Sequence, residues 1–325
     1  MRLFFAAATV AALLATTATA QSVTRRIAVP DGGWDYLSFD AASHRLFVGR
    51  SDGVMTIDVA TDKVTPQLTA ATRTHAALAL GTTGLGAVTS GTAAGVIVFD
   101  ATTGAVKATV PTGPKPDAAI WDPASKTLMI MDSKAGTVTM VDPVTATVAA
   151  TVMVGGALES AALDGRGHLY VAVEDKNEIA AIDLKTKAVT HRKLAGCEEP
   201  AGLALTKGGV LIVTCTNHVA KAVDATTGKA IADLAIGTGP DSVIYDPVHD
   251  RAYIATGRDG MMAVIDTSAR TPKVIASVAT ETGARTGAVD PATGTVYLIA
   301  AKYGPAVAGE RPKAVAGSVE VLAIR

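Results

Sequence analysis

The sequence predicts an all-β protein, a β-propeller of seven four-stranded blades. A short apolar strand that ends in aspartate returns along the chain at a nearly constant interval, as in GVIVFD at 95–100. The six clear copies end at Asp58, Asp100, Asp142, Asp183, Asp224 and Asp266, and their spacing is almost uniform. A period of this length is typical of one four-stranded blade, and no segment shows sustained helical periodicity.

Residues 1–20 have the layout of a secretory signal peptide. Arg2 provides a basic start, an apolar run extends from Leu3 to Leu14, and Ala18-Thr19-Ala20 is a small-x-small cleavage site. A membrane anchor would need about 20 consecutive apolar residues, and the Thr-rich segment from Thr16 interrupts the run. We expect cleavage near Ala20, location in the periplasm or outside the cell, and a propeller domain over 21–325. That length holds seven repeats and one insertion.

The third repeat shows the order of strands within a blade. It predicts an inner strand at 117–123 (DAAIWDP), a second at 127–132 (TLMIMD), a third at 137–142 (TVTMVD) and an outer strand at 148–154 (VAATVMV). Apolar residues alternate along these segments, and D-P, D-G and TTG punctuation separates them. An aspartate at a strand end accepts backbone N–H bonds of the following turn, so the repeating aspartates are structural.

The other repeats follow the same register. We expect inner strands to begin near Asp35, His75, Asp117, Glu159, Ala201, Asp241 and Arg285. We expect second strands at 45–50, 85–90, 168–174, 210–215, 251–256 and 295–300. The last repeat ends with its third strand at 317–325, so VTRRIAV at 23–29 should supply its fourth. Such closure protects the edges of the last blade.

These motifs resemble a known repeat. The order of motifs within a repeat resembles the YVTN or YncE-like propeller repeat. An inner strand ends in D-P or D-G, a YVA-like strand follows, and then comes a VxVID strand followed by TxxV. The segments at 168–189 and 251–266 carry the likeness most clearly, and it covers the mature chain, although the usual Asn after the second strand is mostly replaced. The resemblance implies an exported seven-bladed binding or scaffold protein.

The starts of the inner strands form the main candidate site. All inner strands of a propeller run in one direction along the axis, so equivalent positions gather around one mouth of the channel. The expected ligand-binding residues are Trp34, Asp35, His75, Asp117, Glu159, Asp241 and Arg285. Among the starts of the inner strands, Ala201 is the exception because its side chain is apolar, and Glu199 lies near it in the sequence. Tyr36 joins Trp34 as an aromatic wall, whereas Trp121 is expected to pack. A water-filled channel lined by solvated charges is the alternative.

Oxygen and imidazole ligands suit a divalent cation, for which we predict Asp117, Glu159 and Asp241 as ligands. The loops after the second strands add Arg50, Asp52, Asp132, Glu174, Asp175, His218, Arg258 and Tyr303 on the same face. The segment 303–316 departs from the period and is expected to be a surface loop, either covering the mouth or a tolerated insertion.

Two functional hypotheses follow. The first is a binding protein that recognises a small ligand, a metal ion or a protein partner at this mouth. The second is a metal-assisted hydrolase or lyase of the lactone or ester type, with His75 as the base. Recognised catalytic motifs are absent from the sequence. VDATTGK at 223–229 resembles part of a quinoprotein motif but lacks its final Trp, so no quinone is expected.

The composition argues against some classes of binding partner. The net charge is -1 and aromatic residues make up 4% of the chain, which argues against a basic, stacking surface for nucleic acid. No stretch after residue 20 is long and apolar enough to span a membrane. We expect a monomer.

The two cysteines fall in one repeat. Cys197 and Cys215 are expected near the same end of adjacent strands, where an exported protein permits a disulfide. Two buried thiols are the alternative.

Overall fold

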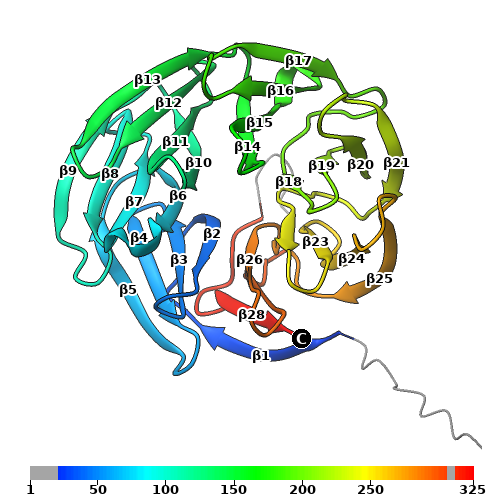
Figure 1. The fold of residues 1–325 in the computed structure, drawn as a ribbon. Helices are drawn as coiled ribbons and strands as arrows, with labels where there is room; N and C mark the ends of the chain where they lie inside the picture. The colour runs from blue at the N-terminus through cyan, green and yellow to red at the C-terminus, as the bar shows by residue number, and fades with distance from the viewer. Residues whose placement is uncertain (1–20, 306–311) are drawn as a thin grey trace, which may run out of the picture.

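The computed structural model describes residues 21–305 and 312–325. These residues form seven four-stranded antiparallel sheets arranged in a ring around a central axis (Figure 1). The protein is therefore an all-β, seven-bladed propeller, as predicted. The predicted signal peptide at 1–20 and the middle of the predicted loop at 303–316 lie outside the described residues.

The first four blades each follow the chain from the axis outward. Blade 1 contains β2 (Trp34–Asp40), β3 (Arg45–Arg50), β4 (Gly53–Asp58) and β5 (Lys63–Ala70). Blade 2 contains β6 (Thr74–Ala79), β7 (Leu85–Ser90), β8 (Gly95–Asp100) and β9 (Val106–Pro111). Blade 3 contains β10 (Pro116–Asp122), β11 (Thr127–Asp132), β12 (Thr137–Asp142) and β13 (Thr147–Met153). Blade 4 contains β14 (Leu158–Leu163), β15 (His168–Val173), β16 (Glu178–Asp183) and β17 (Val189–Lys193).

The remaining blades have shorter inner strands. Blade 5 contains β18 (Leu203–Leu205), β19 (Val210–Cys215), β20 (Val219–Asp224) and β21 (Ala230–Ala235). Blade 6 contains β22 (Ile244–Asp246), β23 (Arg251–Thr256), β24 (Met261–Asp266) and β25 (Lys273–Ala279). Blade 7 contains β26 (Gly287–Asp290), β27 (Thr295–Ala300), β28 (Glu320–Ile324) and β1 (Val23–Ala28). Two one-turn 3-10 helices, η1 (Gly81–Thr83) and η2 (Glu174–Lys176), follow the inner strand of blade 2 and the second strand of blade 4.

Blade 7 joins the two ends of the chain. β1 pairs antiparallel with β28, and Ser22 and Arg325 exchange two backbone hydrogen bonds of 3.1 Å. The predicted closure by the N-terminal strand is confirmed. Because this strand covers the outer edge of β28, the ring is closed by hydrogen bonds as well as by packing.

The repeating aspartates hold the turn between the third and fourth strands. Asp100 Oδ1 accepts the backbone N–H groups of Thr102 at 3.1 Å and Thr103 at 2.9 Å. Asp58 accepts those of Ala60 and Thr61, both at 3.0 Å. These bonds stabilise the ionised form, and they lower the pKa of Asp100. The structural interpretation of the aspartates is thus confirmed at these turns.

The core lies between neighbouring blades rather than at the axis. One buried cluster joins Leu37, Leu46 and Met55 of blade 1 to Tyr297 and Val321 of blade 7. Trp121 packs against a similar cluster between blades 2 and 3, as expected. Among the described residues, no helix has the length and apolar character needed to cross a bilayer.

The inner strands of blades 5 to 7 begin two or three residues later than predicted, at Leu203, Ile244 and Gly287. In blade 6, Pro240 makes only an isolated bridge with Thr256, and the regular ladder begins at Ile244. The predicted positions Ala201, Asp241 and Arg285 therefore lie in loops just before the inner strands.

Candidate functional site

A polar pocket of about 600 Å³ opens at one mouth of the channel. Six of the predicted positions at the starts of inner strands line it: Asp35, His75, Asp117, Glu159, Asp241 and Arg285. All seven blades contribute to its wall. The pocket therefore brings together side chains from nearly the whole length of the propeller sequence.

Backbone irregularities place four of these side chains. The pairing of inner and second strands shifts register between Trp34 and Leu37 in blade 1, and again at the equivalent place in blades 2, 3 and 4. Asp35, His75, Asp117 and Glu159 all fall within these shifts. A β-bulge turns side chains away from the regular alternation of a strand. The bulges therefore direct four ionisable groups to the mouth.

Asp35, His75 and Asp117 form the tightest group in the pocket. His75 Nδ1 lies 2.7 Å from Asp35 Oδ2 and 3.4 Å from Asp117 Oδ1. The hydrogen bond to Asp35 raises the pKa of His75 despite its partial burial. Burial also raises the pKa of Asp117, whose second oxygen lies 3.3 Å from Lys115 Nζ.

This group is the strongest candidate for holding a cation. Each of the three residues offers one ligand atom, and these atoms all lie within 4.8 Å of one another. Among the described residues, no other group of three His, Cys, Asp or Glu side chains does so. It shares only Asp117 with the predicted ligand set, which also contained Glu159 and Asp241. Those residues belong to blades 4 and 6, so the ring geometry spreads the predicted set around the mouth instead of concentrating it.

Glu159 and Glu174 occupy the blade 4 side of the pocket. Burial and the neighbouring carboxylate of Asp117 raise the pKa of Glu159 to about 8. Burial and Glu199 raise the pKa of Glu174. At neutral pH the pocket therefore holds a carboxyl group that is largely protonated but ready to ionise beside a cation.

Asp241 and Arg285 form an ion pair on the side of the pocket that blades 6 and 7 provide. Arg285 Nε lies 2.8 Å from Asp241 Oδ2. Burial still raises the pKa of Asp241 to about 6, against the lowering effect of Arg285. Arg258, from the loop after β23, lines the same side.

Tyr36 forms the floor of the pocket. It lines both the mouth pocket and a smaller cavity of about 200 Å³ deeper in the channel, whose wall is mostly alanine, leucine, serine and valine. Tyr36 belongs to blade 1 but packs against the core cluster of blades 3 and 4, so its ring crosses the channel. Burial and four surrounding carboxylates raise its pKa well above the usual value.

Several predicted residues lie elsewhere. Trp34 does not line the mouth pocket and packs against the core between blades 7 and 1. Arg50 is buried and donates to the carbonyl oxygens of Pro30 and Asp31. Asp132 is fully buried and accepts hydrogen bonds from the hydroxyl groups of two threonines. Of the loop residues predicted to face the mouth, only Glu174 and Arg258 line the pocket within the described structure. The pocket lining also leaves out four more of these predicted loop residues: Asp52, Asp175, His218 and Tyr303.

Tyr303 lies close to the pocket without lining it. A Cβ atom added at Gly283, which lines the pocket, would lie 2.7 Å from the Tyr303 ring. The Tyr303 ring therefore packs against Gly283, next to the pocket. Its backbone forms an antiparallel bridge with Ala314, so the described ends of the predicted loop are held together.

Sequence reasoning missed Lys115 and Thr216 as lining residues. Lys115 has a positive φ of 56° and directly precedes an inner strand, one position before the first ladder residue. Thr216 directly follows the second strand of blade 5. Both residues lie next to predicted strand ends, and this position could have indicated them. Neither was among the loop residues expected at the mouth.

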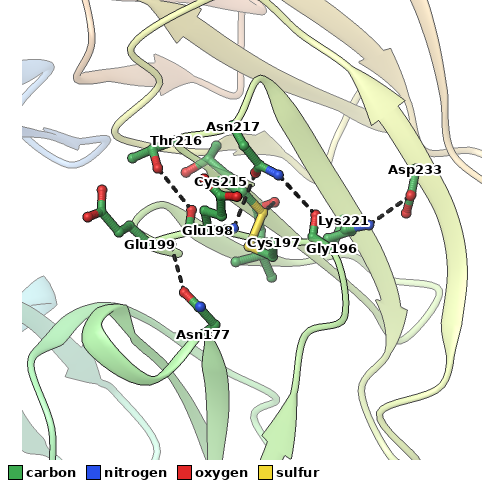
Figure 2. Close-up of a disulfide and its surroundings, with 12 residues drawn as sticks. Asn177, Gly196, Cys197, Glu198, Glu199, Cys215, Thr216, Asn217, Lys221 and Asp233 are labelled. Atoms are coloured by element: carbon green, nitrogen blue, oxygen red, sulfur yellow. Dashed lines mark hydrogen bonds and ion pairs between the residues drawn. A yellow bond between two sulfur atoms is a disulfide. The ribbon is translucent and has the colours of Figure 1, made fainter.

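A disulfide lies beside the pocket wall in blade 5. Cys197 and Cys215 are bonded, with both side chains buried (Figure 2). The segment around this bond is held by further hydrogen bonds. Thr216 N–H donates to Glu198 O at 2.8 Å, and Glu198 N–H donates to Asn217 Oδ1 at 3.2 Å. The bond thus ties the loop before the blade 5 inner strand to the strand end that carries Thr216.

The same loop contacts blade 4. Glu199 has a positive φ of 45°, and its N–H donates to Asn177 Oδ1 at 2.8 Å. Figure 2 shows the Glu199 side chain extending away from the disulfide. Through this contact the blade 5 loop is attached to the blade that provides Glu159 and Glu174.

Comparison with known proteins supports the fold alone. Virginiamycin B lyase from Staphylococcus aureus aligns with a TM-score of 0.73 and 11% identity, over 94% of this chain and 99% of that chain. A chain of Kuenenia stuttgartiensis hydrazine synthase aligns with a TM-score of 0.74 and 15% identity, over 83% and 94%. A chain in the mitotic checkpoint complex aligns with a TM-score of 0.75 and 13% identity, over 92% and 94%.

No protein-family model matches the sequence, and no curated protein matches it. At such low identities the structural similarity defines the class of protein, a seven-bladed β-propeller, and not its activity.

Proposed function

We propose that this protein is an exported, monomeric binding protein that holds a small ligand in the mouth pocket. The observation that carries the proposal is the convergence of five carboxyl groups, three basic side chains and one histidine on a single pocket of about 600 Å³. That volume is within the usual range for small-molecule sites. The YVTN or YncE-like resemblance supports a binding role, and the leader-like segment 1–20 and the disulfide support export.

Raised carboxyl pKa values are the electrostatic support for ligand binding. Asp117 is buried and Glu159 and Asp241 are partly buried at one site, without full compensation of their charges. Perturbed groups of this kind cluster at functional sites. A ligand with positively charged or hydrogen-donating groups would stabilise these carboxylates in their ionised form.

We expect Asp117→Asn to weaken binding of a mouth ligand at least tenfold. A library of small polar molecules and divalent cations, screened by thermal shift, would identify compounds that raise the melting temperature of the wild type. Asp52→Asn is the matched control, because Asp52 is exposed on the same face and does not line the pocket. Equal protection of all three proteins by every ligand would exclude the mouth as the binding site.

A second candidate function is a metal-assisted hydrolase or lyase. The arrangement of Asp35, His75 and Asp117 favours it, because two carboxylates and an imidazole suit a divalent cation. Such a cation would polarise a carbonyl group of the substrate. The fold is compatible with lyase activity, since one structurally similar protein is named a lyase.

Metal analysis separates the two functions. If the protein is a metalloenzyme, the dialysed wild type should retain about one divalent metal ion per chain, and the double variant Asp35→Asn/Asp117→Asn should retain none. His75→Gln should then abolish turnover while retaining the fold. Metal-free wild type that still binds a mouth ligand would rule out the metal-assisted reaction.

A further inference from the structure

The charged groups of the mouth pocket are unevenly paired. Asp35 and Asp117 contact His75, and Asp117 also contacts Lys115. On the blade 6 side, Asp241 is paired with Arg285. Three of the five carboxyl groups therefore already have a basic neighbour.

The two carboxyl groups of blade 4 have no ion-pair partner, although Lys115 lies near enough to lower the pKa of both. Glu159 and Glu174 form no side-chain hydrogen bond or ion pair within the described structure, although both line the pocket and are partly buried. They come from adjacent strand ends, since Glu159 lies at the start of β14 and Glu174 directly after β15. Together they form an acidic wall without a directly paired basic side chain.

Arg258 is the corresponding unpaired base. Its side chain forms no hydrogen bond or ion pair with any residue in 21–305 or 312–325, and it is exposed to the pocket. Gly239 makes room for its stem, because a Cβ atom at Gly239 would lie 2.6 Å from Arg258 Cγ. The guanidinium group is thus free to bind a carboxylate, and its planar donors suit a two-oxygen acceptor.

The unpaired groups of opposite charge lie on different walls. Glu159 and Glu174 belong to blade 4 and Arg258 to blade 6, and blade 5 between them contributes the uncharged Thr216 to the lining. Between these walls the floor is the Tyr36 ring. An alkyl chain packs well on such a ring, and an ammonium group near it gains from the aromatic face.

We infer that the mouth pocket binds a small zwitterion, with its ammonium group at Glu159 and Glu174 and its carboxylate at Arg258. This inference rests on the proposed function and names its ligand class. The charges of the ligand are several bonds apart, as in an ω-amino acid or a dipeptide, because one blade separates the two walls. A simple cation would leave Arg258 without a partner, and a simple anion would leave the acidic wall without one.

A matched set of six-carbon probes tests this inference. 6-Aminohexanoate carries both charges, hexylamine only the ammonium group and hexanoate only the carboxylate. Calorimetry on the wild type should show 6-aminohexanoate binding at least tenfold more tightly than either single-charge probe. 4-Aminobutyrate and 8-aminooctanoate measure the separation that the pocket prefers.

Two variants assign the ends of the ligand. Arg258→Gln should reduce 6-aminohexanoate binding to the level of hexylamine and leave hexylamine binding unchanged. Glu159→Gln should weaken hexylamine and leave hexanoate unchanged. Circular dichroism and melting temperature check that both variants fold.

The outcomes separate this inference from the proposed function. If hexylamine binds the wild type as tightly as every ω-amino acid, or if none of the zwitterions binds, the ligand is not a zwitterion. Should another ligand still bind in a manner that depends on Asp117, the binding function stands without this ligand class. If no ligand depends on Asp117, Glu159 or Arg258 for its binding, both the inference and the proposed function are removed.

Discussion

Replacing both Cys197 and Cys215 by serine is expected to lower the free energy of unfolding by about 3 kcal/mol. The disulfide closes a loop between residues 18 positions apart, and a loop of this size stabilises a protein by that amount through restriction of the unfolded chain. Urea unfolding of the oxidised wild type and the double variant measures the difference.

A second double variant separates the cross-link from the chemistry of the new side chains. Cys197 and Cys215 are 3% and 1% exposed, so serine also buries two hydroxyl groups. Cys197→Ala/Cys215→Ala avoids that cost and should lose nearly the same stability if the cross-link dominates. Wild-type stability in the alanine variant would contradict the prediction.

The disulfide also bears on the pocket through Thr216. The residue directly follows Cys215, and both its N–H and its hydroxyl donate to the carbonyl oxygen of Glu198. Loss of the bond should therefore loosen the blade 5 wall, while the bulges that carry Asp35 and Asp117 stay in place in other blades. The cross-link positions one side of the site and leaves the tightest group of ionisable residues unaffected.

The fold could be predicted closely because each blade repeats the same two signals. Alternating apolar residues mark the strands, and an aspartate ends the third strand of every blade except blade 7. The predicted strands at 45–50, 85–90, 210–215, 251–256 and 295–300 match β3, β7, β19, β23 and β27. The inner strands of blades 5 to 7 were less predictable, since their starts depend on loop geometry around Ala201, Asp241 and Arg285.

The site could be predicted by symmetry but not in its details. Equivalent positions around an axis indicate which residues meet, and six of seven predicted starts line the pocket. Regular alternation places Trp34 and Tyr36 together on the side opposite Asp35. The bulge between Trp34 and Leu37 breaks that pattern, so Asp35 and Tyr36 both line the pocket while Trp34 packs in the core.

The pairing of charges in the pocket is a second detail that could not be predicted from the sequence. Lys115 reaches Asp117 two residues along the chain, whereas Arg285 reaches Asp241 from the next blade. Which carboxyl groups remain unpaired follows from these contacts and not from residue types. The sequence therefore predicted only that these carboxyl groups gather at the mouth, while the structure divides them into paired and unpaired groups.

Glu159→Gln is expected to stabilise the protein at alkaline pH by about 2 kcal/mol, which is less than full conversion of the pKa shift into free energy because solvent screens a partly buried group. Burial first, and then Asp117 and Glu174, raise the pKa of Glu159 from 4.5 to about 8 in the folded protein. Between these two values the folded state holds a proton that the unfolded state releases. Wild-type stability therefore falls as the pH rises through this window.

Urea unfolding at pH 4 and pH 9 checks the sign. At pH 4 Glu159 is protonated in both states, so wild type and Glu159→Gln should unfold at similar urea concentrations. At pH 9 the wild type carries a partly buried carboxylate beside Asp117, Glu174 and Asp241, with Lys115 to offset it, and the variant should be more stable.

A matched control distinguishes this local effect from a general change in charge. Glu198→Gln removes an exposed glutamate outside the pocket lining and should leave the pH dependence of the wild type unchanged. Parallel stability curves for Glu159→Gln and the wild type from pH 4 to pH 9 would mean that Glu159 ionises at its ordinary pKa in the folded protein. The blade 4 wall would then be a solvated surface, and its carboxyl groups would have no unmet requirement for a cation.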